Sequence, residues 1–126
     1  MQKKIYYHDT DCGGVVYYAN YLKYMEEART EFFESRGIML KQLCAQGIMF
    51  VVARQEVDYK APAAYGDCLE VQTRFLDISA VRMVAEHRIT NHEKKVICTG
   101  KTTLVCVDTE IKPRVIPDTI KEKLLK

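Results

Sequence analysis

The sequence predicts a single α+β domain in which an antiparallel sheet curls around one long helix. Its 126 residues are enough for one hydrophobic core and too few for two ordinary domains. Near the N-terminus, a long segment has apolar residues at the spacing of a helix. The segments after it are rich in β-branched and aromatic residues. Because the joins between those segments are too short for parallel crossovers, we expect antiparallel strands.

The N-terminal part is expected to form a short strand, a glycine-marked loop and the long helix. Lys3–His8 alternates weakly and is rich in Ile and Tyr, which suits a strand, and Gly13 and Gly14 then break it. Asn20–Arg36 contains neither Gly nor Pro, and Gly37 is a natural C-terminal stop for a helix. The apolar stripe of that helix is carried by residues spaced four, three and four apart, which are Tyr21, Met25, Ala28 and Phe32.

The rest of the chain has the composition and spacing of strands. Four long segments are expected to pair as a meander, namely Ile48–Tyr59, Cys68–Ile78, Val81–Thr90 and Val96–Asp108. A short helical piece is expected before them at Leu40–Gln46. Another is expected at the C-terminus, where Pro117 and an early Asp118 are followed by late lysines at positions 121, 123 and 126.

A sheet of this size keeps free edges and one poorly covered face, which pairing with a second copy commonly hides. A homodimer or a dimer of dimers is therefore expected. The formal charge of +2 gives no reason to expect a nucleic-acid partner. The apolar runs are far shorter than the roughly 20 residues that cross a bilayer, and no signal-like region opens the chain, so we expect a cytoplasmic protein without a membrane span.

The five cysteines are widely spaced and include no C-x-x-C pair, so they indicate neither a disulfide framework nor a zinc site. The histidines likewise offer no spacing typical of metal ligands. No metal is assigned.

The segment YYHDTDCGGVVYYANY, residues 6–21, carries the candidate chemistry. Glycines let a ligand approach the backbone closely, and the first N–H groups of a helix have no intrahelical partners. Such donors can polarise a carbonyl, while a nearby Asp can act as nucleophile or as general base for a water. The alternative is structural: Asp9, Thr10 and Asp11 satisfy only turn or cap hydrogen bonds, and the tyrosines are core or interface aromatics.

The longer stretch YYHDTDCGGVVYYANYLKYMEEARTEFF resembles the active-site signature of hotdog-fold acyl-CoA thioesterases of the 4-hydroxybenzoyl-CoA thioesterase and YbgC-like group. The pattern there is an aromatic strand, D-x-D-x-x-G-[IV]-V, an aromatic or His, and Asn-Tyr leading into the central helix. The likeness continues through VDYKAPAAYGDCLEV, residues 57–71, and into the later strands. It implies one hotdog domain over residues 1–126, with a five-stranded antiparallel sheet wrapped around the helix.

The resemblance also implies roles for individual residues. Asp11 matches the family's catalytic carboxylate, and Asp9 matches the flanking acid. Tyr18 falls where the backbone N–H at the helix start polarises the thioester carbonyl, a position that is Tyr in the hydroxybenzoyl branch and usually His in the YbgC-like branch. Tyr7 matches an aromatic that lines the site. Substrate contacts are expected from Gly13, Gly14, Val15, Asn20 and Arg82, and phosphate contacts from Lys60, Arg82, Lys101 or the other subunit.

The implied function is hydrolysis of a short-chain or aromatic acyl-CoA to the free acid and CoA, without a metal or redox cofactor. Three alternatives stay open. The first is a non-catalytic acyl-CoA binding module of the same fold. The second is a hydratase or dehydratase, for which no His and acid pair on different elements stands out. The third is a structural partner in a cell-envelope or lipid-synthesis complex.

Overall fold

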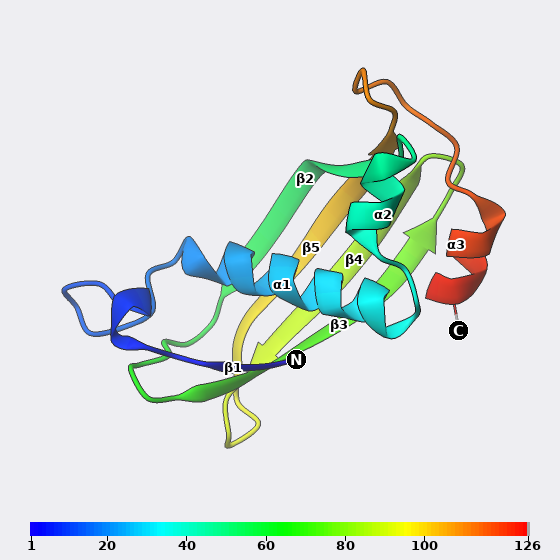
Figure 1. The fold of residues 1–126 in the computed structure, drawn as a ribbon. Helices are drawn as coiled ribbons and strands as arrows, with labels where there is room; N and C mark the ends of the chain where they lie inside the picture. Colours follow the sequence, from blue (N-terminus) through cyan, green and yellow to red (C-terminus); the bar gives the residue numbers. More distant parts are fainter. Residues whose placement is uncertain (126) are drawn as a thin grey trace.

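The computed structural model describes residues 1–125 and shows one sheet with the helices gathered on one of its faces (Figure 1). The strands are β1 (Gln2–Lys4), β2 (Met49–Tyr59), β3 (Cys68–Ile78), β4 (Arg82–Thr90) and β5 (Val96–Val107). The helices are α1 (Asn20–Ser35), α2 (Leu40–Ala45) and α3 (Asp118–Leu124), and a 3-10 turn, η1 (Tyr7–Asp9), precedes α1. Lys126 of the predicted C-terminal helix lies outside the described residues.

The strand order is β1-β3-β4-β5-β2, and every neighbouring pair is antiparallel. This confirms the five-stranded antiparallel sheet around a central helix. The expected meander is wrong in one respect, because β2 pairs with β5 rather than with β3. Residues 60–67 connect β2 to β3, which lie three strand spacings apart, or roughly 14 Å. Eight extended residues span up to about 26 Å, so this connection is long enough. As a result β2 lies at an edge of the sheet.

The first predicted strand is too long. Of the residues predicted as a strand, only those in β1 pair with β3, with Lys3 opposite Leu69. After β1 the chain leaves the sheet. The Asp9 N–H donates to the Tyr6 carbonyl at 3.0 Å, while the Tyr6 N–H donates to Asp9 Oδ2 at 2.8 Å. These two hydrogen bonds close a turn where the sequence predicted extended backbone. His8 and Tyr7 therefore do not alternate as in a strand, and both are exposed.

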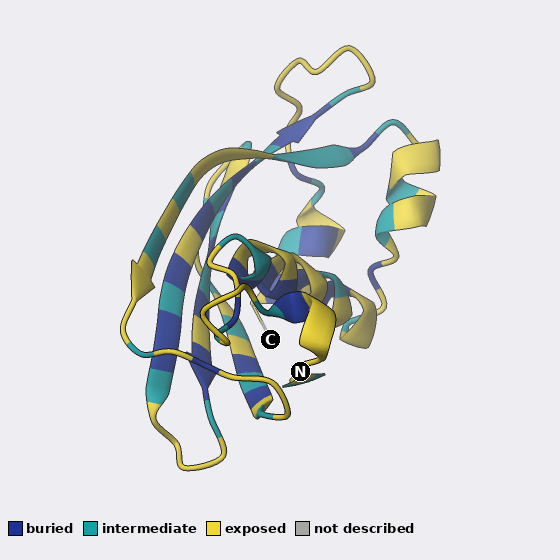
Figure 2. Ribbon diagram, turned by 90° about the vertical axis from the view of Figure 1, so that its left-hand side faces the viewer, coloured by how far each residue is buried: buried dark blue, intermediate teal, exposed yellow. Residues whose placement is uncertain are grey.

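Helix α1 lies in the curve of the sheet, with its buried side toward the strands (Figure 2). Gly100 of β5 permits this close approach, because a Cβ at that position would lie 2.7 Å from the Met25 sulfur. The predicted stripe needs one correction: Phe33 is buried, whereas Phe32 is only half-buried. A helix enclosed by a curved sheet buries a stripe wider than a single row of side chains.

The four long strands, the long helix and the short helix at residues 40–46 are confirmed to within one residue at each end, and the C-terminal helix is confirmed as α3, which ends at Leu124. Helix α1 ends where Gly37 takes a φ of 75°, the left-handed conformation that glycine adopts after a helix. None of the helices within residues 1–125 is long and apolar enough to cross a membrane.

Candidate active site

The loop between η1 and α1 is folded back on itself as a small hairpin. The Asp11 N–H donates to the Val15 carbonyl at 2.9 Å, and the Gly14 N–H donates to the Asp11 carbonyl at 3.0 Å. Gly14 takes a φ of 81°, which residues with a side chain rarely adopt. The second glycine of the pair is thus required by the turn itself.

The crossover between β2 and β3 holds this loop against the end of the sheet. The Val16 N–H donates to the Ala63 carbonyl at 2.8 Å, and Val15 forms an isolated antiparallel bridge with Ala64. The Asp67 carboxylate accepts from the Ala64 N–H at 2.9 Å and so fixes the crossover in turn. Two segments that are far apart in the sequence therefore build one rigid unit.

Asp9 is the buried acid of the segment, with 6% of its surface exposed. Burial opposes ionisation of its carboxyl, but the hydrogen bond from Tyr6 and the nearby Tyr24 phenol and Lys3 ammonium outweigh burial, so the pKa of Asp9 lies below its usual value. Burial and the Asp9 carboxylate both raise the pKa of Tyr24. The Asn20 amide donates to the Asp9 carbonyl at 2.9 Å. Asp9 and Asn20 therefore fix the start of α1, and the amide of Asn20 is already engaged.

Asp11, by contrast, is exposed. Its Oδ1 accepts a hydrogen bond from the Gly13 N–H at 2.8 Å. The Oδ2 atom has no hydrogen-bond or ion-pair partner among the described residues. The local hydrogen bonds of the structural alternative are present, since Thr10 Oγ1 also donates to the Tyr7 carbonyl at 2.7 Å. They use only one of the two carboxylate oxygens of Asp11, and the other is free to act on a ligand.

A turn at residues 17–19 leads into α1 and presents a backbone donor. The Tyr17 N–H donates to the Asp9 carbonyl at 3.0 Å, and the Asn20 N–H donates to the Tyr17 carbonyl at 2.9 Å. The N–H of Tyr18 donates to no group within residues 1–125. The Tyr18 carbonyl accepts a hydrogen bond from the Tyr59 hydroxyl at 3.1 Å, which ties this turn to the end of β2.

Exposed tyrosines surround the loop. Tyr7 and Tyr65 are 78% and 62% exposed, and their rings meet edge to face with centroids 6.0 Å apart. Tyr18 is 61% exposed and makes a similar contact with Tyr59 at 6.2 Å. Tyr59 and Tyr65 were not among the site residues expected from the sequence. Both lie within VDYKAPAAYGDCLEV, so the resemblance of that stretch was the signal that could have identified them.

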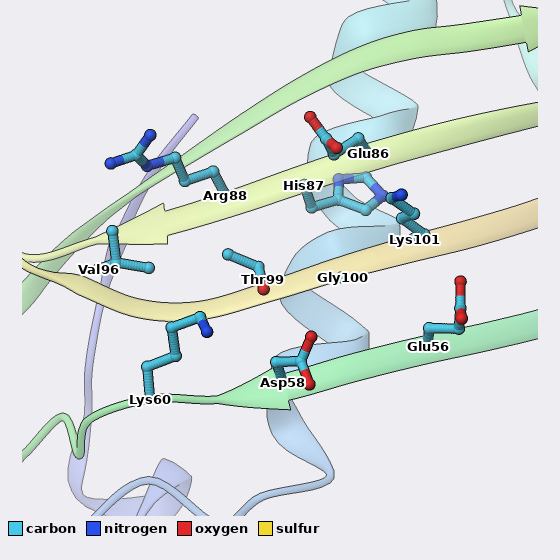
Figure 3. A pocket seen from close by; sticks show the side chains of 10 residues that line it. All are labelled: Glu56, Asp58, Lys60, Glu86, His87, Arg88, Val96, Thr99, Gly100 and Lys101. Atoms are coloured by element: carbon cyan, nitrogen blue, oxygen red, sulfur yellow. The ribbon is translucent and has the colours of Figure 1, made fainter.

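The basic residues considered for phosphate binding do not gather at the loop of the same chain. Arg82 is the first residue of β4. Tyr59, at the loop end of β2, lies in register with Ile89 of β4. Ile89 is seven residues beyond Arg82, so Arg82 lies about 23 Å along the strand from that end of the sheet. Lys60 and Lys101 line a hollow on the outer face of the sheet (Figure 3). Lys60 follows Tyr59 and is thus at the same end of the sheet as the loop, but on its other face.

A second polar cluster, which the sequence did not reveal, is buried between α1 and the sheet. Arg29 Nη1 lies 3.5 Å from His87 Nε2 and 3.3 Å from Thr102 Oγ1, and His87 Nδ1 lies 3.1 Å from Thr73 Oγ1. Since a guanidinium can only donate, Nε2 is the acceptor and His87 is neutral. Burial, together with the charge of Arg29, lowers the pKa of His87 to about 3. In the described part of the chain the ring nitrogens of His87 meet Arg29 and Thr73 and no acid, so the His and acid pair that a hydratase needs is not found there.

Metal ligands are not grouped in the part of the chain that the structure describes: no set of three His, Cys, Asp or Glu side chains is placed to hold an ion. The chemistry available at the loop is that of a carboxylate and a backbone N–H. A carboxylate oxygen can attack a carbonyl carbon or deprotonate a water, and an N–H at a helix start can bind the carbonyl oxygen.

Comparison with known proteins gives consistent matches over nearly the whole chain. Residues 6–124 match the family model of the thioesterase-like superfamily. The acyl-CoA thioester hydrolase YbgC of Escherichia coli is 39% identical over 118 residues, which cover 93% of this chain and 88% of that protein.

Two solved structures are similar in fold. A 1,4-dihydroxy-2-naphthoyl-CoA thioesterase from Synechocystis superposes with a TM-score of 0.93 at 25% identity, covering 100% of this chain and 94% of that one. A thioesterase from Thermus thermophilus, solved with coenzyme A and Zn, superposes with a TM-score of 0.85 at 31% identity, covering 98% and 89%. The hotdog arrangement predicted from the resemblance is thereby confirmed.

Proposed function

Because this chain belongs to the thioesterase-like superfamily and is a thioester hydrolase, we propose that it converts an acyl-CoA to the free acid and CoA at the loop before α1. One observation carries the proposal. The same short loop presents a carboxylate oxygen of Asp11 and an N–H of Tyr18, neither of which has a hydrogen-bond partner within residues 1–125. These are the two groups that hydrolysis of a thioester requires.

Asp11 acts in one of two ways that give the same products. As a general base, Oδ2 takes a proton from water while the water oxygen bonds to the thioester carbonyl carbon. As a nucleophile, Oδ2 itself bonds to that carbon and forms a mixed anhydride, which water then hydrolyses. In both cases the carbon–sulfur bond breaks, the electron pair leaves with the CoA sulfur, and the thiolate takes up a proton.

The N–H of Tyr18 binds the carbonyl oxygen, on which negative charge develops as the carbonyl carbon becomes tetrahedral. The donor belongs to the backbone, so the tyrosine side chain need not take part in this step. The Tyr59 hydroxyl orients the Tyr18 peptide from its carbonyl side, and Asn20 secures the turn to Asp9. Tyr59, Asn20 and Asp9 therefore act as positioning residues.

A short-chain or aromatic acyl group is the substrate that we infer. Aromatic rings favour edge and face contacts with other planar groups, and the exposed rings of Tyr7 and Tyr65 offer both beside the loop. The relative from Synechocystis is a thioesterase for an aromatic acyl-CoA, which supports an aromatic substrate class here.

We also propose that two copies associate through β2. This strand has eleven residues and lies at the edge of the sheet, so one side of its backbone has no strand beside it among the described residues. A second β2 would satisfy those groups and remove the exposed edge. Tyr59 ends β2, so the proposed site would lie next to the second copy.

The assignment is tested by thiol release from a panel of short-chain, long-chain and aromatic acyl-CoAs. We expect turnover, with the highest kcat/KM for a short-chain or aromatic member. The rival, a non-catalytic binding module, predicts that acyl-CoA binds in a calorimetric titration while no member of the panel releases thiol. That pair of results would reject hydrolysis and leave the fold assignment intact.

A further inference from the structure

Asp67 is the last residue of the crossover between β2 and β3, and it is half-buried. The crossover, green in Figure 1, lies beside the blue loop that carries Asp11. Asp67 takes no part in the chemistry proposed for Asp11 and Tyr18. Its hydrogen bonds nevertheless connect it to both ends of the loop in which that chemistry takes place.

A tight turn forms at residues 64–67. The Asp67 N–H donates to the Ala64 carbonyl at 3.0 Å, and Gly66, the third residue of the turn, takes a φ of 89°. These are the features of a type II turn, which favours glycine at its third position because that φ strains other residues. In addition, Asp67 Oδ2 accepts from the Ala64 N–H at 2.9 Å. Asp67 therefore holds Ala64 through both of its backbone groups.

Ala64 in turn holds the part of the loop that follows the glycines. It forms an isolated antiparallel bridge with Val15, and the next N–H, that of Val16, donates to the Ala63 carbonyl at 2.8 Å. The Val15 carbonyl accepts from the Asp11 N–H at 2.9 Å. The residue that the carboxylate holds is thus connected, through a single bridge and one hydrogen bond, to the backbone of Asp11.

The same turn holds the chain where it approaches the loop from β1. The Ile5 N–H donates to the Asp67 carbonyl at 2.8 Å, and the Gly66 N–H donates to the Ile5 carbonyl at 2.9 Å. Ile5 is fully buried and belongs to the hydrophobic core beside α1. Both ends of the catalytic segment therefore meet at one turn, which is itself anchored to the core.

Asp11 depends on this support because it has little of its own. It is exposed, and among the described residues each of its hydrogen bonds is to another member of the loop, namely Gly13, Gly14 or Val15. The place of its carboxylate relative to the Tyr18 N–H is therefore set by how the loop as a whole is held. Displacements of about 1 Å between reacting groups are costly to catalysis.

We propose that Asp67 is a positioning residue for the hydrolytic reaction, acting through the turn at residues 64–67 to fix the Asp11 carboxylate opposite the Tyr18 N–H. This role rests on the function proposed for Asp11. The hydrogen bond to the Ala64 N–H is what it requires, and the charge of Asp67 is not, because an amide oxygen accepts from an N–H as well. An ordinary turn cap would instead affect stability alone.

Two substitutions of Asp67 separate the hydrogen bond from the charge. Asp67→Ala and Asp67→Asn both remove the charge, but only alanine removes the acceptor. We expect Asp67→Ala to lower kcat for acyl-CoA hydrolysis by about tenfold, and Asp67→Asn to restore most of the rate. In amide hydrogen exchange followed by NMR, the N–H groups of Asp11 and Val16 should exchange at least about tenfold faster in Asp67→Ala than in the wild type. Asp67→Asn should keep the wild-type exchange rates.

Asp108→Ala is the matched control. Asp108 is also half-buried, and its Oδ1 accepts from the Glu110 N–H at 2.8 Å and from the Lys112 N–H at 3.1 Å in the turn after β5. That turn lies at the end of the sheet opposite to Tyr59. Asp108→Ala should lower the melting temperature at least as much as Asp67→Ala, because it removes two such hydrogen bonds, and should leave kcat and the exchange of the loop unchanged.

Circular dichroism shows whether each variant is folded. The proposal is overturned if a folded Asp67→Ala keeps the kcat and the loop exchange rates of Asp108→Ala, which is the result for an ordinary turn cap. It is also overturned if Asp67→Asn loses as much kcat as Asp67→Ala, because the charge would then be responsible. Absence of turnover in the wild type would reject hydrolysis itself, and the exchange rates would still decide whether Asp67 holds Asp11 in place.

Discussion

The Gly13 N–H donates to Asp11 Oδ1 at 2.8 Å, and this bond leaves the second oxygen of the carboxylate without a partner among the described residues. The two residues are linked sterically as well, because a Cβ on Gly13 would lie 3.1 Å from the same oxygen. Asp11 is thus held from one side and open on the other.

Gly13→Ala is expected to lower kcat for thioester hydrolysis by about tenfold, because the added methyl displaces the carboxylate and small displacements of reacting groups are costly. The matched control is Gly14→Ala. At that glycine a Cβ meets no atom, but the φ of 81° strains any other residue. Gly14→Ala should therefore lower the free energy of unfolding by about 1 kcal/mol, while Gly13→Ala acts mainly on kcat. Steady-state rates and denaturant unfolding measured on both variants distinguish the two effects, and equal loss of kcat in both would contradict the account.

Asp9→Asn is expected to reduce stability in a pH-dependent way. The pKa of Asp9 is depressed in the folded chain, so its carboxylate contributes stability above the unfolded pKa of about 4, and that contribution is lost as the pH falls through the folded value. The variant should unfold more readily than the wild type at pH 7. The difference should shrink below about pH 4, where the wild-type carboxyl also becomes protonated. Urea unfolding from pH 3 to pH 7 measures this, and a difference that grew toward low pH would refute the role given to Asp9.

His87 should make the fold sensitive to acid. Its pKa is about 3 in the folded chain and about 6.5 when exposed, so the unfolded chain binds a proton that the folded chain excludes. Stability should therefore fall between pH 6.5 and pH 3, by about 1.4 kcal/mol per pH unit from this residue alone. His87→Gln should flatten the profile. The exposed His92→Gln should not, and identical profiles for the two variants would argue against this assignment.

Tyr59→Phe removes the hydroxyl that donates to the Tyr18 carbonyl at 3.1 Å while keeping the ring. If that hydrogen bond orients the Tyr18 N–H, kcat should fall severalfold with little change in KM, since a net hydrogen bond is worth about 1 kcal/mol. Tyr65→Phe is the control, because its described interaction at the loop is a ring contact. Steady-state kinetics on one substrate compare them, and a KM effect without a kcat effect in Tyr59→Phe would contradict an orienting role.

Local patterns predicted the elements of this fold well and their partners less well. The bounds of α1 were predicted closely, because the segment contains no Gly or Pro and is followed by Gly37. Gly37 takes the left-handed conformation in the structure. The position of β2 beside β5 was missed because strand pairing depends on the path of the whole chain, which a period of two does not record. The strand predicted over Lys3–His8 is shorter in the structure because hydrogen bonds between Tyr6 and Asp9 close a turn there. A single contact of this kind produces no repeating pattern in the sequence.

Within the site, the sequence identified the loop but did not distinguish the two acids by environment. The resemblance singled out Asp11, and the structure adds that Asp9 is buried and Asp11 exposed. Arg29 was missed because an arginine within a helix is usually at the surface. Its burial against His87 depends on β4 passing beneath α1, and residues 58 positions apart show no common pattern in the sequence.

The central claim is that Asp11 supplies the reactive carboxylate, and the most direct test is the kcat of Asp11→Asn on the best acyl-CoA of the panel. Asparagine is nearly isosteric, and its side-chain oxygen can still accept from the Gly13 N–H, so the fold and melting temperature should be unchanged. We expect kcat to fall by at least about 100-fold, the usual contribution of a general base or more, and to fall further than in Asp9→Asn. Turnover close to that of the wild type in a folded Asp11→Asn variant would contradict the account.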